Sequence, residues 1–329
     1  MYFARQNMLS QVGTVTTNGV QQQTIALGTF ATGFATMPVW PGVVSPTPLP
    51  PGQFPAGSGI RVFDKNYVNP SVYSYNAAYE QQLAANVVGY VDVTWNEGRH
   101  LTRFLNYNRS GPSCCDLGPN TGDHFAYSGA PWGPQLGEVM VTNARGNSRY
   151  RGLTLGVRKR LSKGYQVEGN YVLAKDEDDD SNERDPFTDV SFNFFDLTKD
   201  WGPAARDIRH KFNAFGYFAL PHALQLSARA QYRGPQPTTP APRVLNGVDR
   251  GRNSDRKDNE FFSFDWRLAR PFRFGGKYEL TPVFEVFNTF NNANNLNPLT
   301  SPQLFDFSGF QRSGVGDPRQ VQLAVKFVF

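Results

Sequence analysis

The end of the chain constrains the fold more than any other stretch. Residues 317–329 are DPRQVQLAVKFVF. Because side chains alternate between the two faces of a strand, this segment forms one apolar face and one mostly polar face. The apolar face carries Val321, Leu323, Val325, Phe327 and Phe329. The sequence therefore finishes on an amphipathic strand with an aromatic last residue.

The same alternation recurs throughout residues 72–329 and predicts roughly ten strands of about 10–12 residues. Short turns are expected at residues 83–86, 162–164, 221–223 and 273–277. Long irregular segments are expected after residue 95, and over about 176–209, 234–260 and 288–316. Short and long connections thus alternate without exception.

This pattern is typical of an outer-membrane barrel, which has short periplasmic turns and longer external loops. Its spanning strands need only about 9–11 residues, half of which can be polar. We therefore predict an all-β fold, a transmembrane antiparallel outer-membrane β-barrel in the cell outer membrane. Outer-membrane lipid and the barrel-assembly machinery are its expected partners, and Val325, Phe327 and Phe329 are its candidate assembly signal.

The distribution of charge supports the same assignment. A Lys or Arg that faces lipid costs about 2–4 kcal/mol at the midplane and about 0–1 kcal/mol near the interface. On the apolar faces we find only Lys159 and Arg270, each beside a short turn. A soluble sandwich or propeller, the rival fold, predicts strands of about 5–6 residues and leaves the alternation of loop lengths unexplained.

The opposite, polar faces supply the candidate lumen-facing residues. They are Gln225, Ser227, Arg229, Gln231, Arg233, Asp265, Arg267 and Glu285. A polar lumen lining is expected in any such barrel. These side chains could therefore contact a plug or a solute, or could simply solvate the wall.

Residues 1–71 are poorly patterned and include a Pro/Gly-rich stretch at 39–59, which we expect to be a loop of the same barrel. The first residues, MYFARQNMLSQ, lack the basic start and apolar core of a signal peptide. Since an exported barrel needs one, either export is the wrong interpretation or the true N-terminus precedes Met1.

Motifs for other chemistry are weak. The adjacent Cys114 and Cys115 match no zinc or redox spacing, and their oxidation state is open. The four histidines are dispersed, and no nucleophile or cofactor motif occurs, so we expect no enzyme activity, metal or cofactor. Arginines scattered among acidic residues, at a net charge of +5, argue against a nucleic-acid partner. The acidic run 176–185 could bind Ca²⁺, although a solvated external loop is the expectation we favour.

Five stretches carry a family resemblance: VYSYNAAYEQQL (72–83), RDIRHKFNAFGYFALP (206–221), NEFFSFDWRLARPFRF (259–274), YELTPVFEVFNTFNNAN (278–294) and residues 317–329. They resemble the C-terminal barrel half of TonB-dependent receptors, and more narrowly the Oar-like group. The resemblance covers roughly residues 60–329. It implies energised uptake or binding of a large solute, with a plug domain and TonB as partners only if a missing N-terminal part exists.

Such receptors form barrels of about 22 strands, about twice the number predicted here. We therefore expect the C-terminal half of a large barrel, a fragment without plug or TonB box. The alternatives are a passive porin-like barrel and a structural or adhesion barrel that acts through its long loops. The solute, whether carbohydrate, peptide or metal chelate, is not determined by the sequence.

Overall fold

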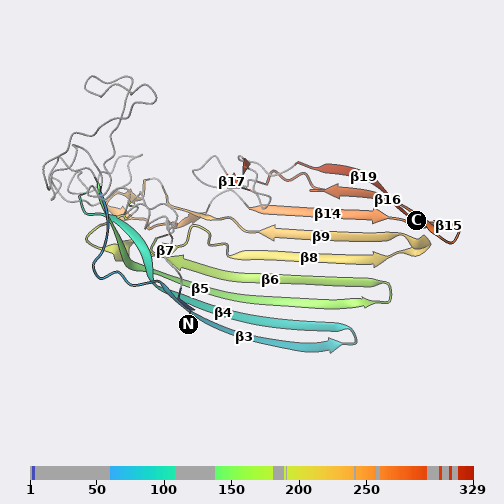
Figure 1. Cartoon of the computed structure of the whole chain (residues 1–329), viewed down its shortest axis with the longest axis horizontal. Helices are drawn as coiled ribbons and strands as arrows, with labels where there is room; N and C mark the ends of the chain where they lie inside the picture. The colour runs from blue at the N-terminus through green and yellow to red at the C-terminus, as the bar shows by residue number, and fades with distance from the viewer. Residues whose placement is uncertain are drawn as a thin grey trace, which may run out of the picture.

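The computed structural model describes residues 2–3, 60–108, 138–180, 189, 191–240, 242–256, 260–294, 304–305, 311–312 and 318–329. Nine long strands lie side by side in one curved antiparallel sheet (Figure 1). They are β3 (Ser71–Ala84), β4 (Val87–Asn106), β5 (Val139–Ser162), β6 (Tyr165–Asp178), β8 (His210–Ala219), β9 (Gln225–Arg233), β14 (Phe261–Ala269), β16 (Tyr278–Phe287) and β19 (Gln320–Val328).

Short strands and 3₁₀ helices extend the sheet or lie in its connections. At the sheet lie β1 (Tyr2–Phe3), β2 (Ile60–Phe63), β7 (Gly202–Pro203) and β15 (Phe272–Phe274). Two-residue strands pair as β10 (Pro237–Thr238) with β13 (Asp255–Arg256), β11 (Val244–Leu245) with β12 (Val248–Asp249), and β17 (Leu304–Phe305) with β18 (Gln311–Arg312). The 3₁₀ helices are η1 (Leu197–Asp200) and η2 (Pro221–Ala223). Among the described residues, no helix is both long and apolar enough to cross a membrane.

The alternation of short and long connections is confirmed. Tight turns join β3 to β4, β5 to β6 and β8 to β9, and all lie at one end of the sheet, where β19 also finishes (Figure 1). The turn between β5 and β6 uses Lys163 (φ 51°) and Gly164 (φ 81°), the two positive φ values that a tight hairpin turn requires. The strand ends that lead into the long connections lie at the other end.

The register confirms that each strand has two chemically different faces. On the apolar face, Leu155 of β5 lies opposite Val91 of β4 and Tyr171 of β6. Side chains on this face are exposed in the isolated chain, including Tyr75 and Leu155. Lys159 lies on the same face at the β5–β6 turn, where its Nζ donates to the carbonyl oxygens of Ser162 and Tyr165.

The strands β4 and β5 are longer than the sequence suggested. An irregular segment was expected after residue 95, but β4 continues to Asn106 and β5 begins at Val139. The pairing of β4 with β5 shifts register around Leu101, next to His100 with a φ of 57°. Beyond this irregularity the strands curl into a region where Phe104, Leu105 and Met140 are buried. β2, within the poorly patterned residues 1–71, pairs with β5 there in parallel.

The sheet does not close within the described residues. β19 pairs with β16, and β3 pairs with β4 and with the two residues of β1. Nine long strands are present where about ten were predicted, and β1 occupies the position of a tenth. Among the described residues, β16 is the one strand that pairs with β19.

Candidate functional site

The residues predicted to face a lumen lie together on the polar face. Arg229 of β9 is the register partner of Asp265 on β14. Arg267 of β14 lies opposite both Ser227 on β9 and Glu285 on β16. Gln225, Gln231 and Arg233 occupy the same face of β9, opposite Ala269, Ser263 and Phe261. The structure thus gathers all the predicted side chains on three neighbouring strands.

Two shallow hollows on this part of the sheet share Arg229 and Phe215 in their linings. One has a volume of about 270 Å³ and includes Asn170, Asn213 and Gln231. The other has a volume of about 340 Å³ and includes Asp265, Arg267 and Glu285, together with the aromatic side chains of Tyr217 and Phe287. Charged and aromatic groups therefore lie side by side at this site.

The aromatic members of this site were missed by sequence reasoning, although the signal was present. Phe215 and Tyr217 alternate with Phe212, Ala214 and Gly216, so the same period of two that defined the apolar face of β8 places them on the polar face.

A row of side-chain amides crosses three strands beside Arg229. Gln231 Nε2 donates to Asn213 Oδ1 at 3.2 Å, and Asn213 Nδ2 donates to Asn170 Oδ1 at 3.4 Å. Each amide offers both donors and an acceptor, so this row can bind neutral polar groups as well as ions.

Asp265 is held by its neighbours. Its Oδ1 accepts a hydrogen bond from Ser263 Oγ at 2.6 Å and another from the backbone N–H of Asn288 at 2.9 Å. The Arg267 Nε lies 3.7 Å from Glu285 Oε1, on a half-exposed surface. Asp265 therefore fixes the end of β16 as well as contributing charge to the polar face.

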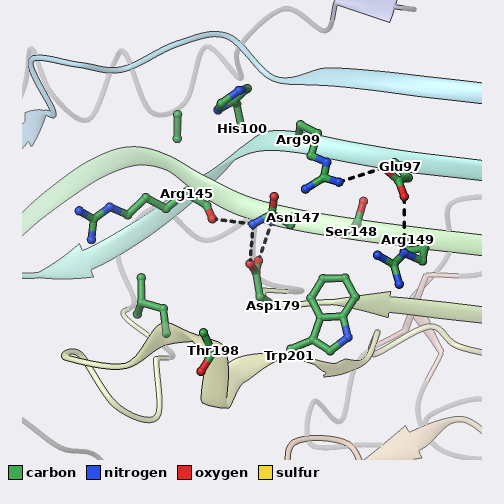
Figure 2. Close-up of a pocket in the computed structure, with 12 residues that line it drawn as sticks. Glu97, Arg99, His100, Arg145, Asn147, Ser148, Arg149, Asp179, Thr198 and Trp201 are labelled. Atoms are coloured by element: carbon green, nitrogen blue, oxygen red, sulfur yellow. Dashed lines mark hydrogen bonds and ion pairs between the residues drawn. The ribbon is translucent and has the colours of Figure 1, made fainter.

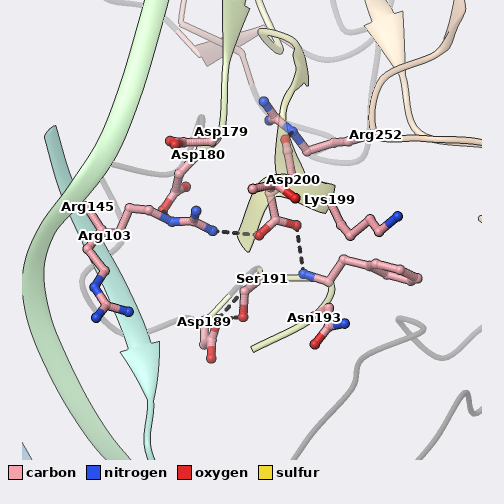
Figure 3. Close-up of polar contacts among 12 residues, drawn as sticks. Arg103, Arg145, Asp179, Asp180, Asp189, Ser191, Asn193, Lys199, Asp200 and Arg252 are labelled. Carbon is pink, nitrogen blue, oxygen red and sulfur yellow. Dashed lines mark hydrogen bonds and ion pairs between the residues drawn. The ribbon is translucent and has the colours of Figure 1, made fainter. Parts of the chain in front are cut away.

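A second polar group, unforeseen in the sequence, lies among the external connections (Figure 3). Arg103 of β4 donates through Nη2 to Asp200 Oδ2 at 2.7 Å, and both side chains are 1% exposed. The other oxygen of Asp200 accepts the backbone N–H of Phe192 at 2.8 Å. Arg243, from the β9–β14 connection, lies 3.8 Å from Asp200. We call these residues, with Asp180, the external cluster.

The first residues of the acidic run do not form a solvated loop. Asp178 is paired with Arg252, and Asp179 accepts hydrogen bonds from the backbone and side-chain amides of Asn147. Asp180 lies 3.6 Å from Arg103 with a side chain only 4% exposed. The expectation of a solvated loop is therefore wrong for 178–180, because residues distant in sequence bind these carboxylates: Arg252, Asn147 and Arg103. Glu183 and Asp185 lie outside the described residues.

No group of His, Cys, Asp and Glu that could hold a metal occurs among the described residues. His210 at the start of β8 contacts Tyr171 Oη through Nδ1 at 2.6 Å, and His222 lies in the η2 turn. Cys114, Cys115 and His124 lie outside the described residues.

The external region also contains a carboxyl group with a raised pKa. Trp95, Arg151 and Lys175 are register partners across β4, β5 and β6, and Asp176 is the next residue of β6 toward the long connections. The backbone N–H of Asp176 donates to Asp207 Oδ1 at 2.8 Å. Burial, followed by the carboxylates of Asp178 and Asp207, raises the pKa of Asp176 from 3.8 to about 6. Folding therefore favours the protonated form of this carboxyl.

This pKa predicts a pH-dependent external region. The contribution of Asp176 to stability is complete below its unfolded pKa and is lost as pH rises through about 6. We expect Asp176→Asn to slow hydrogen exchange in residues 202–207 at pH above about 7, and to leave exchange almost unchanged at pH about 3, below the unfolded pKa of 3.8. An equal effect of the substitution at both values would contradict the raised pKa.

A family model described as "Outer membrane beta barrel domain" matches residues 2–231. The chain is similar to the outer membrane transporter YddB from Escherichia coli, with a TM-score of 0.53 and 10% identity over 83% of this chain and 34% of that one. No curated protein matches the chain.

Two other solved structures are similar to the chain. They are the ferric-catecholate import receptor Fiu from E. coli K12 (TM-score 0.47, 13% identity, 80% of this chain and 28% of that one) and the FrpB iron transporter from Neisseria meningitidis (TM-score 0.47, 12% identity, 82% and 33%). The chain spans about a third of the length of these proteins. Identities this low indicate a shared fold alone.

Proposed function

The chain belongs to the outer membrane β-barrel domain family, whose model matches residues 2–231, and we propose that it forms part of a TonB-dependent receptor. Its location is the cell outer membrane. Its fold is that of outer-membrane transporter barrels, which are not enzymes. The receptor assignment is supported by the resemblance of residues 206–221 and 278–294 to the Oar-like group.

The observation that carries the proposal is the open sheet with one apolar and one polar face. Because an unpaired strand edge is not tolerated in lipid, the nine strands require further strands to close. A receptor barrel of about 22 strands would supply them. In this proposal the chain is the C-terminal part of the barrel, and residues 1–71 belong to the same barrel, supported by the pairing of β1 and β2 with the sheet.

In this barrel the apolar face contacts lipid and the polar face lines the lumen. Arg229, Phe215 and the amide row around Gln231 then meet the plug or a passing solute. Uptake would be driven through a plug and TonB supplied by the rest of the receptor. The site combines ionic, amide and aromatic contacts, which suits a large solute with both polar and flat apolar parts.

The proposal can be tested on the protein purified from native outer membranes. A receptor is expected to be larger than the 36.8 kDa of this chain and to show no steady conductance in a planar bilayer, because the plug closes its lumen. A porin-like barrel of the mass of this chain, with stepwise open-channel conductance, would contradict the receptor and favour the passive alternative.

The C-terminal aromatic residue gives a prediction about assembly. Phe329 is 91% exposed and stacks on Phe327 at 6.0 Å, which in turn stacks on Tyr278 of β16 at 6.0 Å. We expect deletion of Phe329 to reduce the amount of folded protein in the outer membrane severalfold, as measured by heat-dependent gel mobility. Phe329→Tyr should assemble normally, and normal assembly of the deletion variant would refute the signal.

A further inference from the structure

The apolar face turns basic immediately past Trp95. Along β5, Arg151 lies opposite Trp95 and Arg149 lies opposite Glu97. On β6, Lys175 is the register partner of Arg151, and Glu177 that of Arg149. These positions are in phase with Leu153 and Leu155, so their side chains leave the sheet on its apolar side. We call Arg99, Arg149, Arg151 and Lys175 the outward basic patch.

Ion pairs hold the patch in place without neutralising it. Glu97 pairs with Arg99 at 3.0 Å and with Arg149 at 3.7 Å. Glu177 pairs with Arg151 at 2.8 Å and with Lys175 at 2.6 Å. Each carboxylate is thus shared by two cations, which leaves two positive charges in excess. The four basic side chains are 38–50% exposed.

Aromatic rings orient the two central guanidinium groups. The Cζ of Arg149 lies 6.0 Å from the Trp95 ring centroid and 5.8 Å from that of Trp201, and the Cζ of Arg151 lies 5.6 Å from Trp95. Guanidinium groups over an indole face are fixed by cation–π attraction. Their N–H groups are therefore presented in a defined orientation, which favours binding of a planar or tetrahedral oxyanion.

A hollow of about 740 Å³ borders the patch (Figure 2). Arg99, Glu97 and Arg149 lie along one side of it, and Trp201 faces Arg149. Asn147 and Asp179 lie next to them in the lining. The hydrogen bonds of Asn147 satisfy Asp179. The volume is within the range of small-molecule sites, about 300–1,000 Å³.

The position of the patch specifies its ligand. Trp residues of outer-membrane barrels lie at the level of lipid headgroups, and Arg149 and Arg151 lie at or just past Trp95 on the face that contacts lipid. A solute in the lumen would be on the opposite side of the sheet. We propose that the outward basic patch and the adjoining hollow bind the phosphate and sugar of a phosphorylated glycolipid in the outer leaflet. This inference requires the membrane orientation of the sheet and is independent of the receptor role.

The test uses the full protein from native outer membranes, reconstituted in phosphatidylcholine vesicles and titrated with lipid A, a glucosamine lipid that carries phosphates. Arg149→Gln combined with Arg151→Gln leaves Glu97 paired with Arg99 and Glu177 paired with Lys175. At about 1 kcal/mol for each basic residue near an anionic membrane surface, the double variant should bind lipid A roughly thirtyfold more weakly. Lipid A from which the phosphates have been removed should bind the wild-type protein equally weakly.

The matched control is Arg158→Gln combined with Arg273→Gln, which also removes two exposed, ion-paired arginines (47% and 82% side-chain exposure), but from the polar face. It should bind lipid A as the wild-type protein does. Should the glutamine variant fail to fold, Arg149→Lys with Arg151→Lys keeps the charge and should retain phosphate-dependent binding.

Three results would overturn the proposal. The first is unchanged affinity in the glutamine variant. If that variant does not fold, its place is taken by binding to the lysine variant that does not depend on lipid phosphate. The second is equal binding of lipid A with and without phosphates to the wild-type protein. The third is displacement of lipid A by inorganic phosphate alone, which would identify a site for free anions. Weak binding of lipid A by the Arg158→Gln, Arg273→Gln control would likewise show that the effect is not local.

Discussion

Asp200→Ala is expected to destabilise the external region by about 3–5 kcal/mol, because it removes the carboxylate that is hydrogen-bonded to the buried Arg103 and leaves Arg103 with Asp180 at 3.6 Å. The side chains of Arg103 and Asp200 are both 1% exposed, and their N–O distance is 2.7 Å. The substitution also removes the acceptor for the backbone N–H of Phe192 and a neighbour of Arg243. The measurement is hydrogen exchange or limited proteolysis of the external connections in the assembled protein, where cleavage should become much faster.

Two variants of the same segment are matched controls. Asp200→Asn keeps an acceptor for Arg103 and should cost less than Asp200→Ala. Asp196→Ala removes the exposed cap of η1, which accepts from the backbone N–H of Thr198, and should cost about 1 kcal/mol. If Asp196→Ala and Asp200→Ala accelerated proteolysis equally, the buried pair would have no special role.

Leu155→Arg is expected to destabilise the folded barrel by about 2–4 kcal/mol in lipid vesicles. Leu155 lies midway between Arg151 and Lys159 on the apolar face of β5, so a charge there is as far from both interfaces as the strand allows. The measurement is denaturant-induced unfolding of the full protein in vesicles. A position beside a turn, such as Leu226, should respond more weakly because an arginine there reaches the interface.

The control for Leu155→Arg is the adjacent residue on the opposite face. Thr154 lies opposite Asp92 of β4 on the polar face, so Thr154→Arg would place a cation in water beside a carboxylate. We expect its effect on the unfolding free energy to be within about 0.5 kcal/mol. Similar destabilisation by both substitutions would mean that the two faces of the sheet have been assigned incorrectly.

The positions and faces of the strands were predictable wherever a strand has one polar and one apolar face. There the period of two identifies the strand, its faces and its position between turns, as in β9 and β14. The same rule fails past Trp95, where β4 continues through Thr102, Arg103 and Phe104, all buried. A strand enclosed on both sides loses its alternation, and the register shift near Leu101 interrupts it further.

The site was predictable to the same extent. The polar face of β9 could be named from alternation alone, and Phe215 and Tyr217 could have been added by applying it to β8. The external cluster could not, because Arg103 and Asp200 are separated by 97 residues and neither lies in a motif. For the same reason, the sequence of the acidic run did not indicate that Arg252 would pair with Asp178 and Arg103 with Asp180.

The cross-linking of the external connections has a consequence for recognition at the outer mouth. Arg103 from β4, Asp200 from the β6–β8 connection and Arg243 from the β9–β14 connection meet at one buried point. Loops joined in this way lose little conformational entropy when a ligand arrives, and preorganisation of that kind increases affinity. In the proposed receptor, such a rim would select incoming molecules by fit to a fixed outline, and a molecule that touches one of these two connections would also act on the other and on β4.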